Sequence, residues 1–146
     1  MSDFIEHNIL SAIENLLTGR ANELLGEAEF QIAPFEFGAP VGVGAVEPVL
    51  RLTECERSEK ERIVRLDSYA LMLTLQVPEG PYGGRDAYAY GAVISRAVAE
   101  NCTLGDMVDR AVMTGKKYVP PKTPHCGEGW QVELKLHILP ERRSGY

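Results

Sequence analysis

The feature that most constrains this fold is a strict alternation of side chains at residues 130–139, near the C-terminal end of the chain. Apolar residues occupy every second position there, and mainly polar residues lie between them. The apolar set is Trp130, Val132, Leu134, Leu136 and Ile138. A period of two puts each set on its own face of a β-strand. Residues 71–77 alternate in the same way, and two such strands favour an antiparallel sheet packed on one side.

Two other segments carry apolar residues at helical spacing. The first begins at Ile5, and its apolar positions are Ile5, Ile9, Ile13, Leu16, Leu17 and Leu24. Gly19 is expected to end or loosen this helix, and Gly26 is expected to stop it. The second segment, Ala87–Glu100, has its stripe at Tyr90, Val93, Ile94, Ala97 and Val98. Such stripes are what helices present to a sheet, and Asp86 is the expected N-cap of the second helix.

A charged segment separates two apolar runs in the middle of the chain. Val49, Leu50 and Leu52 predict a short strand, and residues 63–77 predict a long one. Residues 54–62 mix both signs of charge and are predicted to be the solvated connection of a hairpin. Residues 107–118 fit a short helix or a strand equally well. The order of elements predicts an α+β fold, with a mainly antiparallel sheet and two principal helices on one face.

Prolines and glycines punctuate residues 33–48, which nevertheless carry several apolar side chains. Proline excludes a continuous helix there. A long apolar loop is unusual inside a compact domain, so we expect an extended arm that a neighbouring subunit covers. Its candidate contact residues are Phe35, Phe37, Val41 and Val43.

Length and composition indicate one domain spanning residues 1–146, with residues 141–146 as a flexible tail. Hydrophobic residues make up 45% and charged residues 25%, which argues against disorder. The net charge of −6 offers no basic footprint for nucleic acid or for an anionic membrane. We find no signal peptide and no apolar run of about 20 residues, and three widely spaced cysteines suggest reduced thiols. These features predict synthesis in the cytoplasm.

Candidate chemistry is sparse. Residues 80–84 are rich in glycine but lack the spacing and the lysine of a phosphate-binding loop. His125 and Cys126 are adjacent, yet no second pair of ligands accompanies them at the spacing that zinc sites use. We therefore assign no catalytic, cofactor-binding or metal-binding residue. The alternative is a small ligand-binding domain or enzyme that uses the His125–Cys126 loop, which requires a pocket with Glu or His partners nearby.

The chain also resembles a known family in its order of elements. A strand at residues 68–77 leads through a Pro/Gly turn to the helix Ala87–Glu100. A Thr103-Leu104-Gly105 turn follows, and the chain closes on a strand that begins at Trp130. This pattern resembles the tail-terminator, or tail-to-head joining, proteins of long-tailed bacteriophages and prophages. The arm and the loop at residues 120–126 are longer than the pattern requires, so another head-to-tail adaptor or minor tail protein is the structural alternative.

The resemblance implies a structural protein without catalytic residues or cofactor. It implies a homo-oligomeric ring, typically a hexamer, that caps the tail tube and meets the head connector. DNA would only pass through the lumen, where acidic side chains would keep it from adhering. Such a protein is made in the host cytoplasm, does not contact a membrane, and ends in the tail or neck of the virion.

Charged residues of the hairpin supply the remaining candidates for subunit contacts. Glu56, Arg57 and Lys60 lie in the connection that is predicted to project from the domain. A basic group formed by Arg110, Lys116 and Lys117 is interpreted as ordinary surface, with a docking patch for an acidic partner as the alternative.

Overall fold

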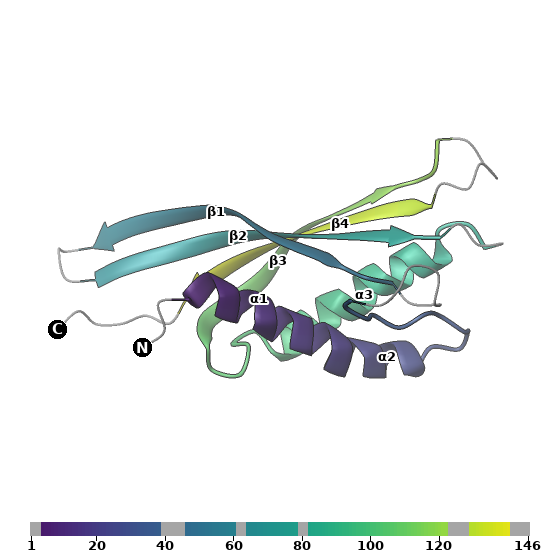
Figure 1. Cartoon of the computed structure of the whole chain (residues 1–146), viewed down its shortest axis with the longest axis horizontal. Helices are drawn as coiled ribbons and strands as arrows, with labels where there is room; N and C mark the ends of the chain where they lie inside the picture. The colour runs from purple at the N-terminus through teal and green to yellow at the C-terminus, as the bar shows by residue number, and fades with distance from the viewer. Residues whose placement is uncertain (1–3, 39–45, 61–63, 79–81, 123–128, 141–146) are drawn as a thin grey trace.

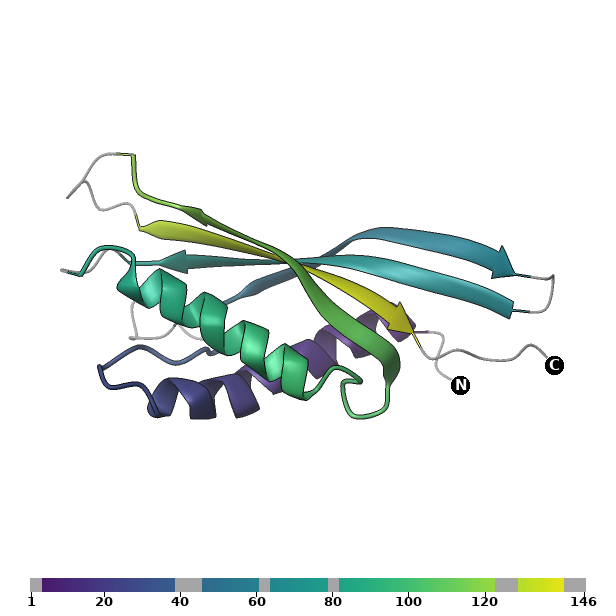
Figure 2. The same ribbon diagram turned by 180° about the vertical axis from the view of Figure 1, so that it is seen from behind.

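The computed structural model describes residues 4–38, 46–60, 64–78, 82–122 and 129–140. The order along the chain is α1 (Ile5–Leu16), the π-helical turn η1 (Leu17–Ala21), α2 (Asn22–Gly26), β1 (Val49–Lys60), β2 (Val64–Val77), α3 (Arg85–Glu100), β3 (Val108–Val119) and β4 (Trp130–Pro140). The strands form one antiparallel sheet in the order β1-β2-β4-β3. All the helices lie on one face of this sheet (Figures 1 and 2), which confirms the predicted α+β class.

The first helix continues from α1 through η1 into α2. Its buried positions follow the predicted stripe and include Ile9, Ile13 and Leu17. Gly19 lies inside the π-helical turn, so it loosens the helix without ending it. The helix ends at Gly26, as predicted.

The second principal helix, α3, buries Tyr90, Ile94, Ala97 and Val98 of its predicted stripe. The predicted cap was wrong: Gly84 is the N-cap, and Asp86 lies within the first turn. The preceding Gly83 has φ +61, a left-handed conformation that turns the chain one step before the cap. Asp86 still favours the helix there, because a carboxylate in the first turn complements the helix dipole.

The core forms where the two central strands meet the helices. Register pairs Leu71 with Leu136 and Leu73 with Leu134. All four side chains are almost completely buried on the helix side. The alternation of both strands therefore gives the sheet one covered face and one open face, as the sequence predicted.

The predicted charged connection is a strand instead of a loop. β1 continues to Lys60, and its ladder with β2 runs as far as the pair Lys60–Val64. Register places Arg57 opposite Asp67 and Glu59 opposite Arg65. A bulge between Leu52 and Glu54 shifts the alternation, so the sequence of β1 does not show a regular strand pattern.

The segment that the sequence left undecided forms the edge strand β3. It pairs with β4 along its length, with register shifts between Val108 and Arg110 and between Met113 and Gly115. These two irregularities interrupt the period of two, which explains why the pattern fitted neither element clearly.

Candidate assembly surface

The outer part of the β1–β2 hairpin extends beyond the rest of the sheet. β2 pairs with β4 only from Tyr69 to Val77. Beyond that, Glu56–Lys60 and Val64–Ser68 pair with each other, without a third strand among the described residues. Figure 1 shows this two-stranded segment, which we call the ribbon, passing the N-terminal end of α1. A two-stranded hairpin alone is marginally stable in water, so a contact with another molecule would stabilise it.

The hairpin candidates for subunit contacts all lie on the ribbon. Glu56 is exposed, as is Glu54 just before it. Arg57 and Lys60 follow along the same strand. Register aligns Glu54 with Ala70 and Glu56 with Ser68. Because Ala70 alternates with the buried Tyr69 and Leu71, these two glutamates belong to the face of the sheet that the helices leave open.

The arm candidates have a different position. Phe35 is only 2% exposed, and its ring lies 5.1 Å from that of Tyr90. It is covered by its own chain, so the expectation that a neighbouring subunit covers it was wrong. Phe37 is partly buried against the same core, and Val41 and Val43 lie outside the described residues. Sequence alone could not show this, because the space that Phe35 fills exists only between the packed helices.

Backbone contacts hold both ends of the arm to the domain. Phe35 and Val46 form an isolated parallel bridge, in which Glu36 donates from its backbone N–H to the carbonyl of Val46 at 3.1 Å. Val46 is 3% exposed and donates to the carbonyl of Pro34 at 3.0 Å. The segment is therefore anchored where it leaves and where it rejoins the domain.

A hollow on the open face of the sheet is rich in lysine. Lys116, Lys117 and Lys135 line it, together with one carboxylate, Glu133, and Met72. The Lys117 ammonium lies 4.0 Å from a Glu133 carboxylate oxygen. The open face thus presents two cations, Lys117 and Lys135, and one anion at this hollow, in a chain whose net charge is −6. Of the predicted basic group, Lys117 lies here; Lys116 borders the hollow, but its register partner is the buried Leu134, so its side chain belongs to the helix side of the sheet.

Arg110 lies elsewhere, at the other end of β3. Register pairs it with Leu139, while Lys117 pairs with Glu133. The sequence missed Lys135, which is distant along the chain and reaches the hollow only because β4 lies beside β3. Its alternation with buried Leu134 and Leu136 is the signal that would have placed it on the open face.

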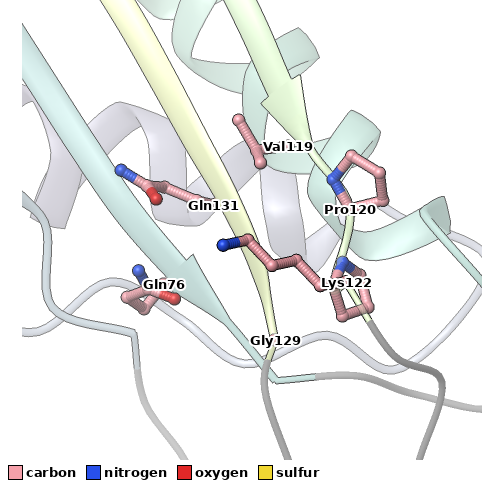
Figure 3. A pocket seen from close by; sticks show the side chains of 7 residues that line it. Gln76, Val119, Pro120, Lys122, Gly129 and Gln131 are labelled. Carbon is pink, nitrogen blue, oxygen red and sulfur yellow. The ribbon is translucent and has the colours of Figure 1, made fainter.

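A second hollow lies where the sheet ends near the β3–β4 connection (Figure 3). Gln76, Val119, Pro120, Lys122, Gly129 and Gln131 line it. These residues offer two amides and one ammonium group and contain no carboxylate, thiol or imidazole. His125 and Cys126 fall outside the described residues, so the alternative that uses them gains no partner from this lining.

Across the described ranges, no cluster of three or more His, Cys, Asp or Glu side chains could hold a metal ion. Cys55 is exposed and Cys102 half-buried, and both are free thiols. In the same part of the chain, no helix is long and apolar enough to cross a membrane.

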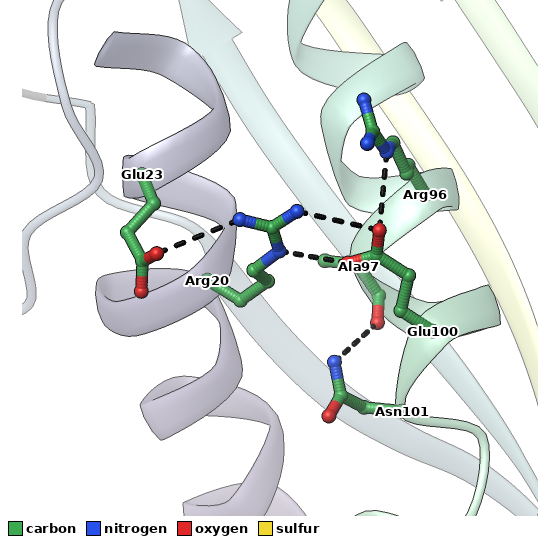
Figure 4. A network of polar contacts seen from close by, with 6 residues as sticks. All are labelled: Arg20, Glu23, Arg96, Ala97, Glu100 and Asn101. Carbon is green, nitrogen blue, oxygen red and sulfur yellow. Dashed lines mark hydrogen bonds and ion pairs between the residues drawn. The ribbon is translucent and has the colours of Figure 1, made fainter. Parts of the chain in front are cut away.

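An ion cluster joins the first helix to α3 on the helix side of the molecule (Figure 4). Arg20 donates from Nε and Nη2 to the two carboxylate oxygens of Glu100, at 2.7 and 3.3 Å. Arg96 donates to Glu100 at 3.1 Å, and Arg20 also meets Glu23 at 3.5 Å. The hydrogen bond from Arg20 lowers the pKa of Glu100 below its ordinary value. Since the cluster links two elements of one chain, its role is structural.

Comparison with family models and with curated protein sequences yields no match. The features of the molecule that bear on its function are the ribbon and the open face of the sheet.

Proposed function

We propose that this chain is a structural protein that self-assembles into a ring, and that this ring caps a phage or prophage tail tube and joins it to the head connector. The β1–β2 ribbon is the observation that carries the proposal. It projects from a domain that is otherwise well packed, and within the described residues no third strand pairs with it. A projecting ribbon of this kind is suited to lie on another subunit.

The ring form is supported by the asymmetry of the candidate surfaces. The ribbon and the lysine-rich hollow are different patches of the same chain. When such a contact is made once between each pair of neighbours it is heterologous and generates a closed ring or an open filament, whereas a reciprocal contact made twice gives a two-fold dimer. The resemblance in element order supports the specific role at a phage tail. It spans almost the whole chain, from the first helix to the closing strand. No catalytic role is part of this proposal.

The first experiment measures the mass of the purified protein by light scattering over a range of concentrations. We expect a discrete assembly, with a hexamer as the typical size. The matched variant replaces residues 56–68 by an Asn-Gly turn, which closes the hairpin directly after Cys55 and before Tyr69. This variant should remain monomeric and should keep the circular dichroism and the cooperative unfolding of the intact domain. A strictly monomeric wild-type protein would contradict self-assembly.

The role at the tail is tested separately by electron microscopy with isolated phage tail tubes. A tail terminator should bind one end of the tube, and the variant without the ribbon should bind it less often. Binding to the head connector, with no binding to the tube end, would instead support the alternative of another head-to-tail adaptor.

A further inference from the structure

We propose that the lysine-rich hollow on the open face of the sheet receives Glu54 and Glu56 of a second copy of this chain. This inference rests on the proposed self-assembly and adds which surfaces meet. The occupant, a second copy of the chain, would cover the face of the sheet that the helices leave open.

The hollow concentrates positive charge on the open face of the sheet. Lys117 comes from β3 and Lys135 from β4, and both are exposed on the open face. Lys116 also borders the hollow, but it shares the strand face of Tyr118, which packs against Tyr88 of α3. The one contact with an acid is that of Lys117 with Glu133, at the long distance of 4.0 Å. Within the described residues, Lys116 and Lys135 make no ion pair with their own chain. The open face of the hollow therefore carries more positive than negative charge and is suited to an acidic partner.

Two acidic residues of β1, at the base of the ribbon, form the surface that the hollow would receive. Glu54 and Glu56 are both exposed and stand two positions apart on β1, so they lie on the same face of the strand. Glu56 is the first residue of the ribbon on β1, and Glu54 lies two positions before it, beside the last part of β2 that pairs with β4. Two carboxylates at this spacing present a short negative row that complements the lysines of the hollow.

Two copies could also join edge to edge, by pairing of their edge strands, but the edges of this sheet oppose such pairing. The edge strand β1 has a bulge between Leu52 and Glu54, and the edge strand β3 has two irregular positions. Lys116 and Lys117 lie on β3, and Pro120 and Pro121 follow it directly. Bulges, lysines and prolines are the features by which proteins protect edge strands from pairing. A contact through the open face avoids these obstacles.

The test uses two charge-reversed variants, alone and mixed. One carries Glu54→Lys and Glu56→Lys, and the other carries Lys117→Glu and Lys135→Glu. Each variant alone brings like charges together, so we expect it to need a concentration at least about tenfold higher than wild type to assemble. An equal mixture restores opposite charges at every contact and should assemble at the wild-type concentration. In a ring, this mixture must give an even number of subunits.

Matched controls show whether a loss of assembly comes from charge at the contact or from any change in net charge. Arg110→Glu changes the open face away from the hollow, and Glu29→Lys changes an exposed site on the loop after α2. Both controls should assemble like wild type. Raising the salt concentration should weaken wild-type assembly, because salt screens exposed ion pairs. All variants should unfold at wild-type temperatures, since the substituted side chains are exposed.

The outcomes distinguish this inference from the proposed function. If wild type assembles and the two reversed variants assemble equally well, the docking site is wrong and self-assembly stands. The docking site is also wrong if the mixture fails to restore assembly. It is likewise wrong if the variant with Lys117→Glu and Lys135→Glu assembles normally and loses only binding to duplex DNA. If wild type stays monomeric at every concentration, both proposals fall. A mixed dimer would support the docking contact and overturn the ring.

Discussion

The side-chain amide of Asn22 bonds both backbone groups of Phe35. Asn22 Oδ1 accepts the Phe35 N–H at 2.7 Å, and Asn22 Nδ2 donates to the Phe35 carbonyl at 2.9 Å. The amide thereby replaces the neighbouring strand that these backbone groups would otherwise need. It fixes the arm to the first helix at the point where Phe35 enters the core.

Asn22→Ala should lower the free energy of unfolding by about 1–3 kcal/mol. The substitution leaves the partly buried N–H and carbonyl of Phe35 without partners, and that loss exceeds the value of an average hydrogen bond. Urea unfolding followed by circular dichroism measures it. Asn15→Ala, at an exposed position of the first helix, is the control and should stay close to wild type. Equal stability of the two variants would show that the contact contributes nothing.

Tyr90→Phe should cost about 1 kcal/mol. The Tyr90 hydroxyl donates to the Ala33 carbonyl at 2.7 Å, and phenylalanine leaves that acceptor unpaired while keeping the ring contact with Phe35. Burial also raises the pKa of Tyr90, so the folded protein retains this hydroxyl proton well into the alkaline range. The measurement is thermal unfolding at neutral pH. Tyr82→Phe, at a side chain that is 65% exposed, provides the comparison and should be neutral.

Gly91→Ala should destabilise the protein by up to about 2 kcal/mol, although alanine is the better helix former. A methyl group at Gly91 would overlap the Tyr118 hydroxyl and lie 3.0 Å from the adjacent ring carbon. The Tyr118 ring has little room to move, since it packs against Tyr88 at 5.0 Å between ring centroids. Overpacking costs about 1–3 kcal/mol, more than the roughly 1 kcal/mol that helix propensity returns.

A double-mutant cycle checks the cause of this effect. In a Tyr118→Phe background, the missing hydroxyl removes the closest overlap, so Gly91→Ala should cost clearly less there. An equal cost in both backgrounds would locate the strain somewhere other than Tyr118.

Glu100→Gln should make stability less dependent on acid pH. The hydrogen bond from Arg20 lowers the folded-state pKa of Glu100 below its ordinary value near 4.5. A lowered pKa contributes stability that is present above the unfolded-state pKa and is lost as pH falls through the folded-state value. Urea midpoints at several pH values between 7 and 3 give the comparison. The gap between wild type and variant should be widest at neutral pH and should close toward pH 3; a constant gap would contradict the linkage.

Periodicity in the sequence determined the parts of the fold that one face or one stripe defines. The alternation around Leu73 and Leu134 indicated the central strands, because a period of two admits only one buried face. The stripes of Ile9 and Ile13 and of Ile94 and Val98 indicated the two principal helices for the same reason, with a period of 3.6. These local signals were enough for the α+β class and for the hairpin.

Only the tertiary structure decided the rest. A bulge after Leu52 and backbone pairing with β2 let a charged segment continue as a strand, and the outer half of that strand became the ribbon. Phe35 became a core residue because the packed helices and Asn22 receive it. Lys135 joined Lys117 because β4 and β3 are neighbours in the sheet. Local sequence cannot specify such contacts, because they depend on which distant segments the buried apolar faces bring together.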